Sequence, residues 1–223
     1  MSKLPEDPEG FIRTNTALEA PAMVPEFRLW LASEYVPIWQ ATESWLEEKN
    51  VDPPYWAFCW PGGQAVARYL LDNPGLVRGR RVLDFAAGSG VSSMAAAHSG
   101  AASVVANDID QLSLVAARLN ATANGLAIDT SSEDWLAGAP GAPEADVVIA
   151  GDVCYEREMS VRALAWLRSH AARGRLVLLG DPGRNYFSAQ GLVECARYEI
   201  PTSLQLENRG MRETVVWQVL PHP

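Results

Sequence analysis

The chain has 223 residues, which is enough for one domain with an extension and a full hydrophobic core. Its net charge of −9 argues against nonspecific nucleic-acid binding, which needs clustered cations, and suits a basic peptide or protein partner. The three cysteines and three histidines are scattered along the chain, so they predict neither a disulfide framework nor a metal site.

The first residues carry no targeting signal. They are acidic and lack both the apolar core of a secretory signal and the arginines of a transit peptide. No stretch of the sequence is long and apolar enough to span a bilayer. We therefore expect a soluble, cytoplasmic monomer that binds neither nucleic acid nor membrane.

Prolines and aromatic residues mark off the chain that precedes the predicted sheet. Residues 1–25 hold four of the fifteen prolines and predict a flexible, extended arm. Residues 26–63 predict an N-terminal extension, with a helix over 26–50 and then an aromatic loop whose prolines prevent regular helix. The main domain is expected over 64–223.

From residue 62 onward, strand and helix patterns alternate. In chain order they are a helix from Gly62-Gly63 to about 72, strand 81–85, helix 91–99, strand 103–107, helix 111–123, a weak strand at 127–129, strand 145–150, helix 158–171, strand 175–180, helix 186–195, and a closing antiparallel pair at 197–206 and 213–220. Strands separated by helices imply right-handed crossovers. The pattern predicts an α/β fold with a mostly parallel seven-stranded sheet and helices on both faces.

The turn after the first parallel strand is the most informative feature of the sequence. Asp84 lies near the end of that strand, and the small residues Ala86, Gly88 and Gly90 follow. Glycine lets the backbone approach a ligand that a Cβ would repel, and open α/β sheets bind ligands at strand ends. A dinucleotide site needs a third glycine, where this chain has Ser93. Asp84 also favours a cationic ligand over an anionic pyrophosphate.

This turn, together with Asp108 at the end of the next strand, resembles the first two motifs of the seven-β-strand (class I) S-adenosylmethionine-dependent methyltransferases. The resemblance implies a Rossmann-like class I fold with S-adenosylmethionine as cofactor. It also implies that Asp108 accepts hydrogen bonds from the ribose hydroxyls and that Asp84 favours the cationic amino-acid end. The cofactor-binding residues expected on this basis are Trp60, Asp84, Ala86, Gly88, Gly90, Asp108, Ile109, Asp134, Trp135 and Asp152. Helix capping is the alternative for Asp108.

Asp134 and Trp135 are expected beside the adenine. In the same family reading, Asp134 accepts a hydrogen bond from the exocyclic amine and Trp135 flanks the ring. Simple core packing is an equal alternative for Trp135.

The run Asp152-Val153-Cys154-Tyr155 follows the next buried strand and matches acid-x-x-aromatic, a motif of a lysine-directed branch of these enzymes. The spacing can place Asp152 and Tyr155 on either side of a reacting amine. That amine must be neutral, although its unperturbed pKa is about 10.4, and its lone pair must be aligned with the methyl group. We expect Asp152, Tyr155 and Glu156 to be the catalytic residues. The two carboxylates hold the ammonium, and proton acceptance by either is left open. The alternative is a strand-end turn without chemistry.

Four further runs resemble the lysine methyltransferases of the electron transfer flavoprotein β subunit. These runs are Pro53–Ala65, Arg68–Pro74, Ala106–Asp110 and Gly180–Arg184, and the likeness extends over roughly residues 25–220. The resemblance implies a protein-lysine N-methyltransferase whose substrate is that flavoprotein subunit. Because the animal members are mitochondrial and this chain shows no transit peptide, we expect a bacterial homologue.

Three other functions stay open at the level of sequence. One is methylation of a ribosomal protein lysine, and another is a noncatalytic S-adenosylmethionine-binding scaffold. The third is a nicotinamide oxidoreductase, against which the missing third glycine counts. A dead enzyme could have lost Asp152 or Tyr155, and both are present.

Overall fold

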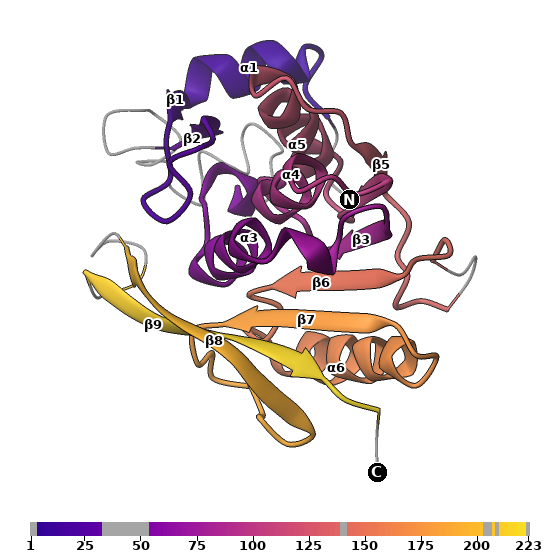
Figure 1. The fold of residues 1–223 in the computed structure, drawn as a ribbon. Coiled ribbons are helices and arrows are strands. Elements are labelled where there is room, and N and C mark those ends of the chain that lie inside the picture. The colour runs from indigo at the N-terminus through magenta and orange to yellow at the C-terminus, as the bar shows by residue number, and fades with distance from the viewer. Residues whose placement is uncertain (1–3, 33–53, 139–141, 203–206, 208–209, 222–223) are drawn as a thin grey trace.

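A seven-stranded sheet forms the centre of the computed structural model, which describes residues 4–32, 54–138, 142–202, 207 and 210–221 (Figure 1). The strand order is β5-β4-β3-β6-β7-β9-β8, and only the pairings of β9 with β7 and β8 are antiparallel. The strands are β3 (Arg81–Phe85), β4 (Ser103–Asn107), β5 (Asp129–Ser131), β6 (Val147–Gly151), β7 (Leu176–Asp181), β8 (Leu192–Pro201) and β9 (Met211–Val219). The predicted mostly parallel seven-stranded sheet is confirmed.

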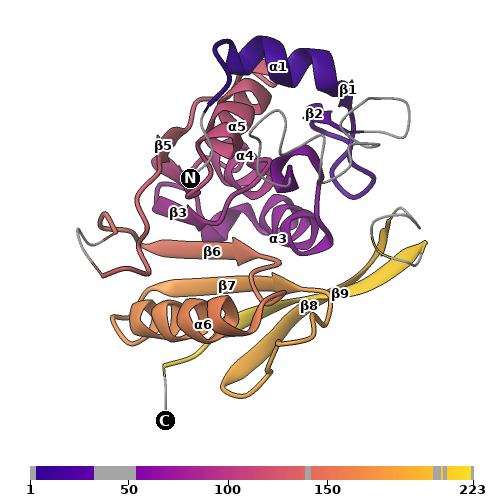
Figure 2. The ribbon, with the colours of Figure 1, turned by 180° about the vertical axis from the view of Figure 1, so that it is seen from behind.

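Helices cover both faces of this sheet (Figures 1 and 2). They are α3 (Pro61–Asp72), α4 (Val91–His98), α5 (Gln111–Ala123) and α6 (Arg157–Ala171), with short 3-10 turns at Tyr55–Ala57 and Pro74–Leu76. Ile149 of β6 packs into the cluster that contains α3 and α4, whereas its neighbours Val148 and Ala150 pack into the cluster that contains α6. Successive strand residues point to opposite faces, so an apolar run with no polar alternation has to be covered on both sides.

Local signals set the helix boundaries that matter for the site. Asp110 precedes α5, and its carboxylate accepts a hydrogen bond from the Leu112 amide at 2.9 Å. This cap supplies a partner for an amide that the helix itself leaves unpaired. As a result, α5 begins immediately after the loop that follows β4. The bounds expected for β3, β4 and α5 are those observed.

The N-terminal region differs from the expected flexible arm. Residues Pro8–Asn15 form helix α1, and Ala17–Glu19 (β1) pairs with Leu29–Leu31 (β2), so residues 29–31 are strand where a helix over 26–50 was predicted. The remainder of that predicted helix, at 33–53, lies outside the described residues. Asp7 caps α1 by accepting from the Gly10 amide at 2.9 Å, and Ile12 is fully buried. The prolines therefore stand at the first position of α1 or outside these elements, and they do not prevent their formation.

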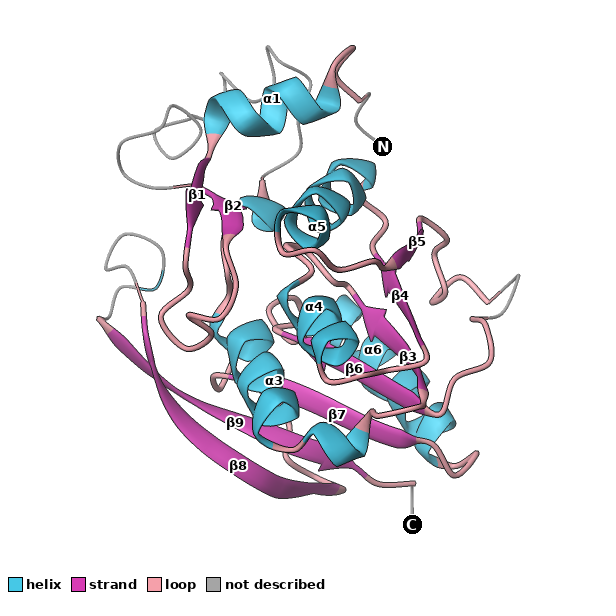
Figure 3. Cartoon of the chain, turned by 45° about the horizontal axis from the view of Figure 1, so that its top comes forward, coloured by secondary structure: helices cyan, strands magenta, loops and turns pink. Residues whose placement is uncertain are grey.

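The β2 strand is fastened to α5 by two asparagines. Asn120 accepts from the Trp30 amide at 2.7 Å, and Asn124 accepts from the Arg28 amide at 2.9 Å while donating to the Arg28 carbonyl at 2.7 Å. These hydrogen bonds supply partners for backbone groups on the unpaired edge of the hairpin formed by β1 and β2. A two-stranded hairpin alone would be only marginally stable. The N-terminal segment lies over α5 at the top of the molecule (Figure 3).

Two further expectations, which concern the edge strands β8 and β5, are wrong. The predicted helix over 186–195 is absent, because Leu192 already begins β8, which pairs with β9. The weak strand falls at Asp129–Ser131 instead of 127–129. In addition, α3 runs through residue 64, so a boundary there would cut a continuous helix, and the division into extension and main domain stays a prediction. None of the helices in the described part of the chain has the length and apolar character needed to cross a bilayer.

Candidate active site

A cavity of about 1030 Å³ opens at the carboxyl edge of the parallel strands. β3 and β6 are neighbours, but the chain continues from β3 toward β4 and β5 and from β6 toward β7 on the other side. Open α/β sheets bind ligands at such a reversal. Ten of the predicted site residues line the cavity: Trp60, Ala86, Gly88, Asp108, Ile109, Asp134, Trp135, Asp152, Tyr155 and Glu156. Asp84 and Gly90 are not among its lining residues.

The turn after β3 is held in a conformation that favours glycine. Ala86 and Gly88 have φ angles of +55° and +51°, so Ala86 adopts the left-handed region without being glycine. A Cβ at Gly88 would meet no protein atom within 4 Å, which leaves open space on the cavity side. Gly90 has another role, because its Cβ would lie 2.8 Å from the Ala117 Cβ. Gly90 lets α4 pack against α5.

Asp84 lies beneath the turn and does not face the cavity. Its side chain is buried and accepts a hydrogen bond from the Ser93 hydroxyl at 2.6 Å. Burial raises the pKa of Asp84 to about 7, against the opposing effect of the Ser93 hydrogen bonds. Ser93, which replaces the third glycine of a dinucleotide site, is therefore the partner of this carboxyl group.

Asp108 is the carboxylate that reaches the cavity from β4. Its two oxygens accept from the Gly88 amide and the Asp110 amide, both at 3.0 Å. Burial raises its pKa to about 6, and these two amide hydrogen bonds oppose the rise. A carboxylate oxygen accepts more than one hydrogen bond, so two diol hydroxyls can still be received. The next residue, Ile109, is 61% exposed at the cavity mouth.

Asp134 and Trp135 reach the cavity after β5, in different ways. The Asp134 carboxylate accepts from the Leu136 amide at 2.9 Å and from the Ala137 amide at 3.2 Å, which forms its own turn. Trp135 is buried and stacks on Trp166 with ring centroids 5.9 Å apart. Trp135 therefore combines core packing with a place in the cavity wall, and both interpretations of it remain open.

Asp152 joins three segments of the chain at one point. One carboxylate oxygen accepts from the Gly62 amide at 2.5 Å and the Gly63 amide at 3.3 Å, at the start of α3. The other oxygen accepts from Arg184 through Nε at 3.0 Å and Nη2 at 2.6 Å. Burial raises the pKa of Asp152, and the Arg184 guanidinium opposes that rise. A positive φ of 56° adds to the constraint on this residue.

Aromatic side chains form the outer rim of the cavity. The Tyr55 ring lies 5.8 Å from Tyr155 and 6.1 Å from Trp60, and the indole of Trp60 donates to the Tyr55 carbonyl at 2.8 Å. Tyr55 and Tyr155 are each about half exposed. Glu156 lines the same rim, and among the described residues its carboxylate has no hydrogen-bond partner. The rim can therefore receive a cationic, partly apolar side chain.

Sequence analysis missed Tyr55, the N-terminal residues Leu4 and Pro5, and Arg184 among the lining residues. Arg184 lies in the Gly180–Arg184 run, which was noted only as a likeness. Leu4 and Pro5 belong to the arm expected to be flexible, and nothing local in the sequence ties them to the cavity.

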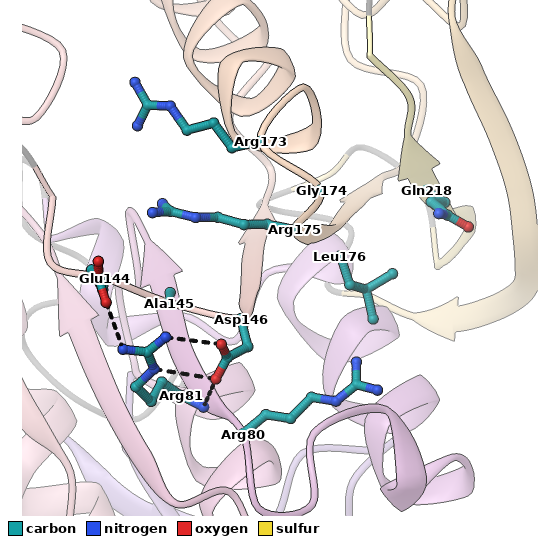
Figure 4. Close-up of a pocket in the computed structure, with 10 residues that line it drawn as sticks. All are labelled: Arg80, Arg81, Glu144, Ala145, Asp146, Arg173, Gly174, Arg175, Leu176 and Gln218. Carbon is teal, nitrogen blue, oxygen red and sulfur yellow. Dashed lines mark hydrogen bonds and ion pairs between the residues drawn. The ribbon is translucent and has the colours of Figure 1, made fainter.

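A second cavity, of about 560 Å³, lies at the opposite edge of the sheet, where the parallel strands begin (Figure 4). Its walls include Arg80, Arg81, Arg173 and Arg175. Arg81 is paired there with Glu144 and Asp146 at 2.9 and 3.0 Å. None of the predicted site residues lines this cavity, so it is separate from the site described above.

Comparison with curated proteins gives matches along most of the chain. The chain is 38% identical over 221 residues to the "Electron transfer flavoprotein beta subunit lysine methyltransferase" of Xenopus laevis, covering 96% of this chain and 87% of that protein. The protein of the same name from Homo sapiens is 34% identical and covers 96% of this chain and 84% of its own length. These relatives are animal proteins, so they do not support the expected bacterial origin.

Two further comparisons concern the central fold. A family model described as ribosomal protein L11 methyltransferase (PrmA) matches residues 69–153. The solved structure of magnesium protoporphyrin IX methyltransferase from Synechocystis PCC 6803 with bound SAM superposes with a TM-score of 0.52 at 19% identity, covering 70% of this chain and 77% of that one. At this identity the likeness establishes the fold, a Rossmann-like class I methyltransferase sheet.

Proposed function

The chain belongs to the electron transfer flavoprotein beta subunit lysine methyltransferase family, and we propose that the electron transfer flavoprotein beta subunit is its own protein substrate. It is an S-adenosylmethionine-dependent protein-lysine methyltransferase. The observation that supports the proposed substrate most directly is the identity of 38% over 96% of this chain to a relative named for that substrate. The acidic and aromatic rim around Tyr155 and Glu156 agrees with a lysine as the acceptor.

The described residues fit S-adenosylmethionine. The backbone at Gly88 leaves space that a Cβ would fill, and the Asp108 carboxylate faces the cavity with acceptor capacity for a ribose diol. Trp135 offers an apolar wall, while Asp134 lies beside it for a polar edge. When bound, S-adenosylmethionine supplies an electrophilic methyl group on a sulfonium. Asp84 supports the turn from beneath and does not contact the cofactor, because its carboxyl group accepts a hydrogen bond from the Ser93 hydroxyl.

The roles proposed for the rim follow from the chemistry of lysine. The amine has to lose its proton before it can attack, and its ordinary pKa is about 10.4. The rings of Tyr55, Trp60 and Tyr155 remove water from the amine, which favours the neutral form. Glu156 attracts the incoming ammonium from the half-exposed side of the rim. Orientation of the lone pair then supplies most of the rate enhancement.

Asp152 has a different proposed role from that expected. Both of its oxygens already accept two hydrogen bonds each, from the first amides of α3 and from Arg184. A carboxylate so occupied has little capacity left for an ammonium group. We therefore assign contact with the reacting amine to Tyr155, keep Glu156 at the exposed rim as the group that attracts the incoming ammonium, and assign Asp152 to the wall that places Tyr155.

The test is methylation of purified electron transfer flavoprotein with labelled S-adenosylmethionine, followed by mass spectrometry of the beta subunit. Ribosomal protein L11 is the competing substrate, because the L11 family model matches residues 69–153. We expect label on lysines of the beta subunit and none on L11. Label on L11 alone would overturn the proposed substrate, and label on neither protein would do so as well. The monomeric state is a prediction that the same preparation can test, and the masses of the labelled peptides give the number of methyl groups, which the sequence does not predict.

A further inference from the structure

Four charged side chains form an ion ladder that starts at the wall of the cavity: Asp152, Arg184, Glu207 and Arg212. The first two line the cavity, and the other two continue the ladder behind them. Arg184 binds Asp152 through Nε and Nη2, at 3.0 and 2.6 Å. Its Nη1 and Nη2 also bind Glu207, at 3.1 and 2.7 Å. Arg212 donates to Glu207 from the other side at 2.9 Å. The four charges sum to zero.

This ladder is buried, so its charges depend on one another. The side chains of Arg184, Asp152 and Glu207 are only 16%, 10% and 3% exposed. Removing one partner from a buried pair leaves an uncompensated charge in a poor solvent, which is strongly unfavourable. Arg184 is the central member, because it alone contacts both carboxylates.

The backbone around Arg184 is also fixed. Asp181 accepts from the Gly183 amide at 2.7 Å and from the Arg184 amide at 2.8 Å. The guanidinium lies 5.5 Å from the centre of the Trp60 ring, which forms part of the aromatic rim. The Gly180–Arg184 run therefore brings a planar cation to the two carboxylates and the rim together.

The ladder has a consequence for the reacting amine. An unpaired carboxylate beside a lysine stabilises the ammonium form and raises its pKa, which opposes the attack. Asp152 lies at the carboxyl edge of β6, three residues before Tyr155. Because Arg184 compensates its charge, Asp152 can hold the residues of the rim in place without raising the pKa of the substrate amine.

We propose that Arg184 is a positioning residue for methyl transfer: it holds Asp152 against the start of α3 and cancels its charge, so that the substrate lysine meets a wall that favours its neutral form. The part of this inference that concerns lysine rests on the proposed function, whereas the part that concerns Asp152 does not. The other groups facing Asp152 are Glu207, Asp181 and the thiols of Cys59 and Cys154. Burial raises the pKa of both thiols to about 12, so they add no charge near neutrality.

The first experiment measures the pH dependence of kcat for Arg184→Gln and Arg184→Lys. In Arg184→Gln the uncompensated Asp152 raises the pKa of the bound lysine, so the acid limb moves to higher pH by about 1 unit. At pH 7.5 kcat should then fall about tenfold. Arg184→Lys restores the positive charge but not the paired contacts that Nε and Nη2 make with Asp152. The acid limb of its kcat profile should therefore return toward the wild-type position. Affinity for S-adenosylmethionine, measured by calorimetry, should change less than threefold in either variant (~0.6 kcal/mol at most).

Arg197→Gln is the matched control. Arg197 on β8 is also paired with two carboxylates, Glu194 at 2.7 Å and Glu213, but it is about half exposed and lies outside the cavity lining. Its pH profile should coincide with that of the wild type. If the profile of Arg184→Gln also coincides with it, with kcat lowered by the same factor at every pH, the proposal fails. An equal loss of cofactor affinity and kcat would overturn it too.

A second experiment needs no methyl acceptor, so it separates this proposal from the proposed substrate. The Tm of Arg184→Gln should fall more steeply with rising pH than the Tm of the wild type between pH 5 and 8, because Asp152 then ionises without a cation partner. Adding Asp152→Asn to Arg184→Gln should remove that extra decline. If the double variant keeps it, Asp152 is not the group that Arg184 compensates. If the wild type methylates no flavoprotein but the melting curves behave as expected, only the substrate assignment fails.

Discussion

At the scale of single residues, Asp108 is the side chain that binds the cofactor most directly in our proposal. Its pKa of about 6 means that it is ionised at pH 8 and mostly protonated at pH 5. A protonated carboxyl group is a poorer acceptor for two ribose hydroxyls. Affinity for S-adenosylmethionine should therefore weaken as pH falls through 6.

The variant Asp108→Asn tests this assignment. It should cost about 1.5–3 kcal/mol of cofactor binding, the range for a hydrogen bond to a charged group, and it should flatten the dependence on pH. Isothermal calorimetry at pH 5, 6, 7 and 8 measures both effects. Asp134→Asn is the companion variant, since Asp134 also lines the cavity but already accepts from two amides of its own turn. Unchanged affinity in Asp108→Asn at pH 8 would refute the ribose contact.

A second prediction at this scale concerns Glu156 on the half-exposed rim. Glu156→Gln removes the charge proposed to attract the substrate ammonium. Exposed ion pairs are worth about 0.2–1 kcal/mol, so KM for the protein substrate should rise at most about fivefold, with no change in KM for S-adenosylmethionine. Glu158→Gln is the matched control, because Glu158 lies in the first turn of α6, directly after the capping position of Glu156, and does not line the cavity. Equal effects in the two variants would reduce the role of Glu156 to general surface charge.

At the scale of elements, the start of α3 packs on the ends of β6 and β7 more closely than a side chain allows. A Cβ at Gly62 would collide with the Gly180 carbonyl and lie 2.5 Å from an Asp152 carboxylate oxygen. A Cβ at Gly151 would lie 2.6 Å from the Gly63 amide nitrogen. One close contact between backbones therefore explains why glycine occurs at Gly62, Gly151 and Gly180, which lie far apart in the sequence.

Gly62→Ala should therefore destabilise the protein by about 1–3 kcal/mol, the usual cost of an overpacked site. That loss corresponds to roughly 2–4 °C in Tm per kcal/mol for a chain of this size. Gly75→Ala is the control, since a Cβ there would meet nothing within 4 Å. Calorimetric melting of both variants checks the prediction, which is wrong if Gly62→Ala melts with the wild type.

The elements also show where the sequence was sufficient. β3, β4 and α5 were predicted with correct bounds, because β3 and β4 are short apolar runs that reach Asp84 and Asn107, and α5 lies between the capping residue Asp110 and Asn124-Gly125. β8 was missed in its first half, because Leu192–Arg197 carries helix-forming residues and becomes a strand through pairing with β9, which is distant in the sequence. α1 was missed because prolines were read as signs of disorder, although Pro8 follows the capping residue Asp7 and opens a helix.

The candidate site divides in the same way. Asp108 and Tyr155 were found because each follows a recognisable strand and lies where the chain leaves the sheet. The sequence could not show that both carboxylate oxygens of Asp152 already accept hydrogen bonds, because the donors come from α3 and from the loop after β7. Asp84 was placed near the cofactor by motif, whereas its burial against Ser93 depends on how α4 packs. Motifs thus located the edge of the site, and tertiary contacts determined which oxygens remain available.

At the scale of the whole molecule, several buried carboxyl groups predict an unusual dependence of stability on pH. The pKa values of Asp84, Asp108 and Asp181 are raised to about 7, 6 and 6, with burial as the first cause in each case. In the unfolded chain these groups titrate near 3.9. Between those values the folded protein binds more protons than the unfolded one, so the free energy of unfolding falls as pH rises.

One group acts in the opposite direction over part of this range. Burial lowers the pKa of His170 to about 4, so its contribution rises with pH until the unfolded imidazole has lost its proton near 6.5. Above that pH it adds nothing, and Asp84 is still ionising. The net prediction is a Tm that is lower at pH 8 than at pH 6. The loss is steepest at about pH 5, where all three carboxyl groups are still largely protonated in the folded protein, and it levels off above about pH 7.5, where Asp84 has ionised in the folded protein as well.

Asp84→Asn tests the largest contribution to this decline. The amide keeps an oxygen for the Ser93 hydroxyl but has no proton to lose, so Tm should fall less between pH 6 and 8 than in the wild type. Asp146→Asn is the matched control: the Arg81 ion pair lowers the pKa of Asp146 to about 2, which lies outside this range. Its melting curve should shift equally at every pH, whereas Asp84→Asn changes the slope. Parallel curves for the wild type and Asp84→Asn would mean that Asp84 is already ionised in the folded protein at pH 6, and that its burial against Ser93 is compensated by solvent or by another group.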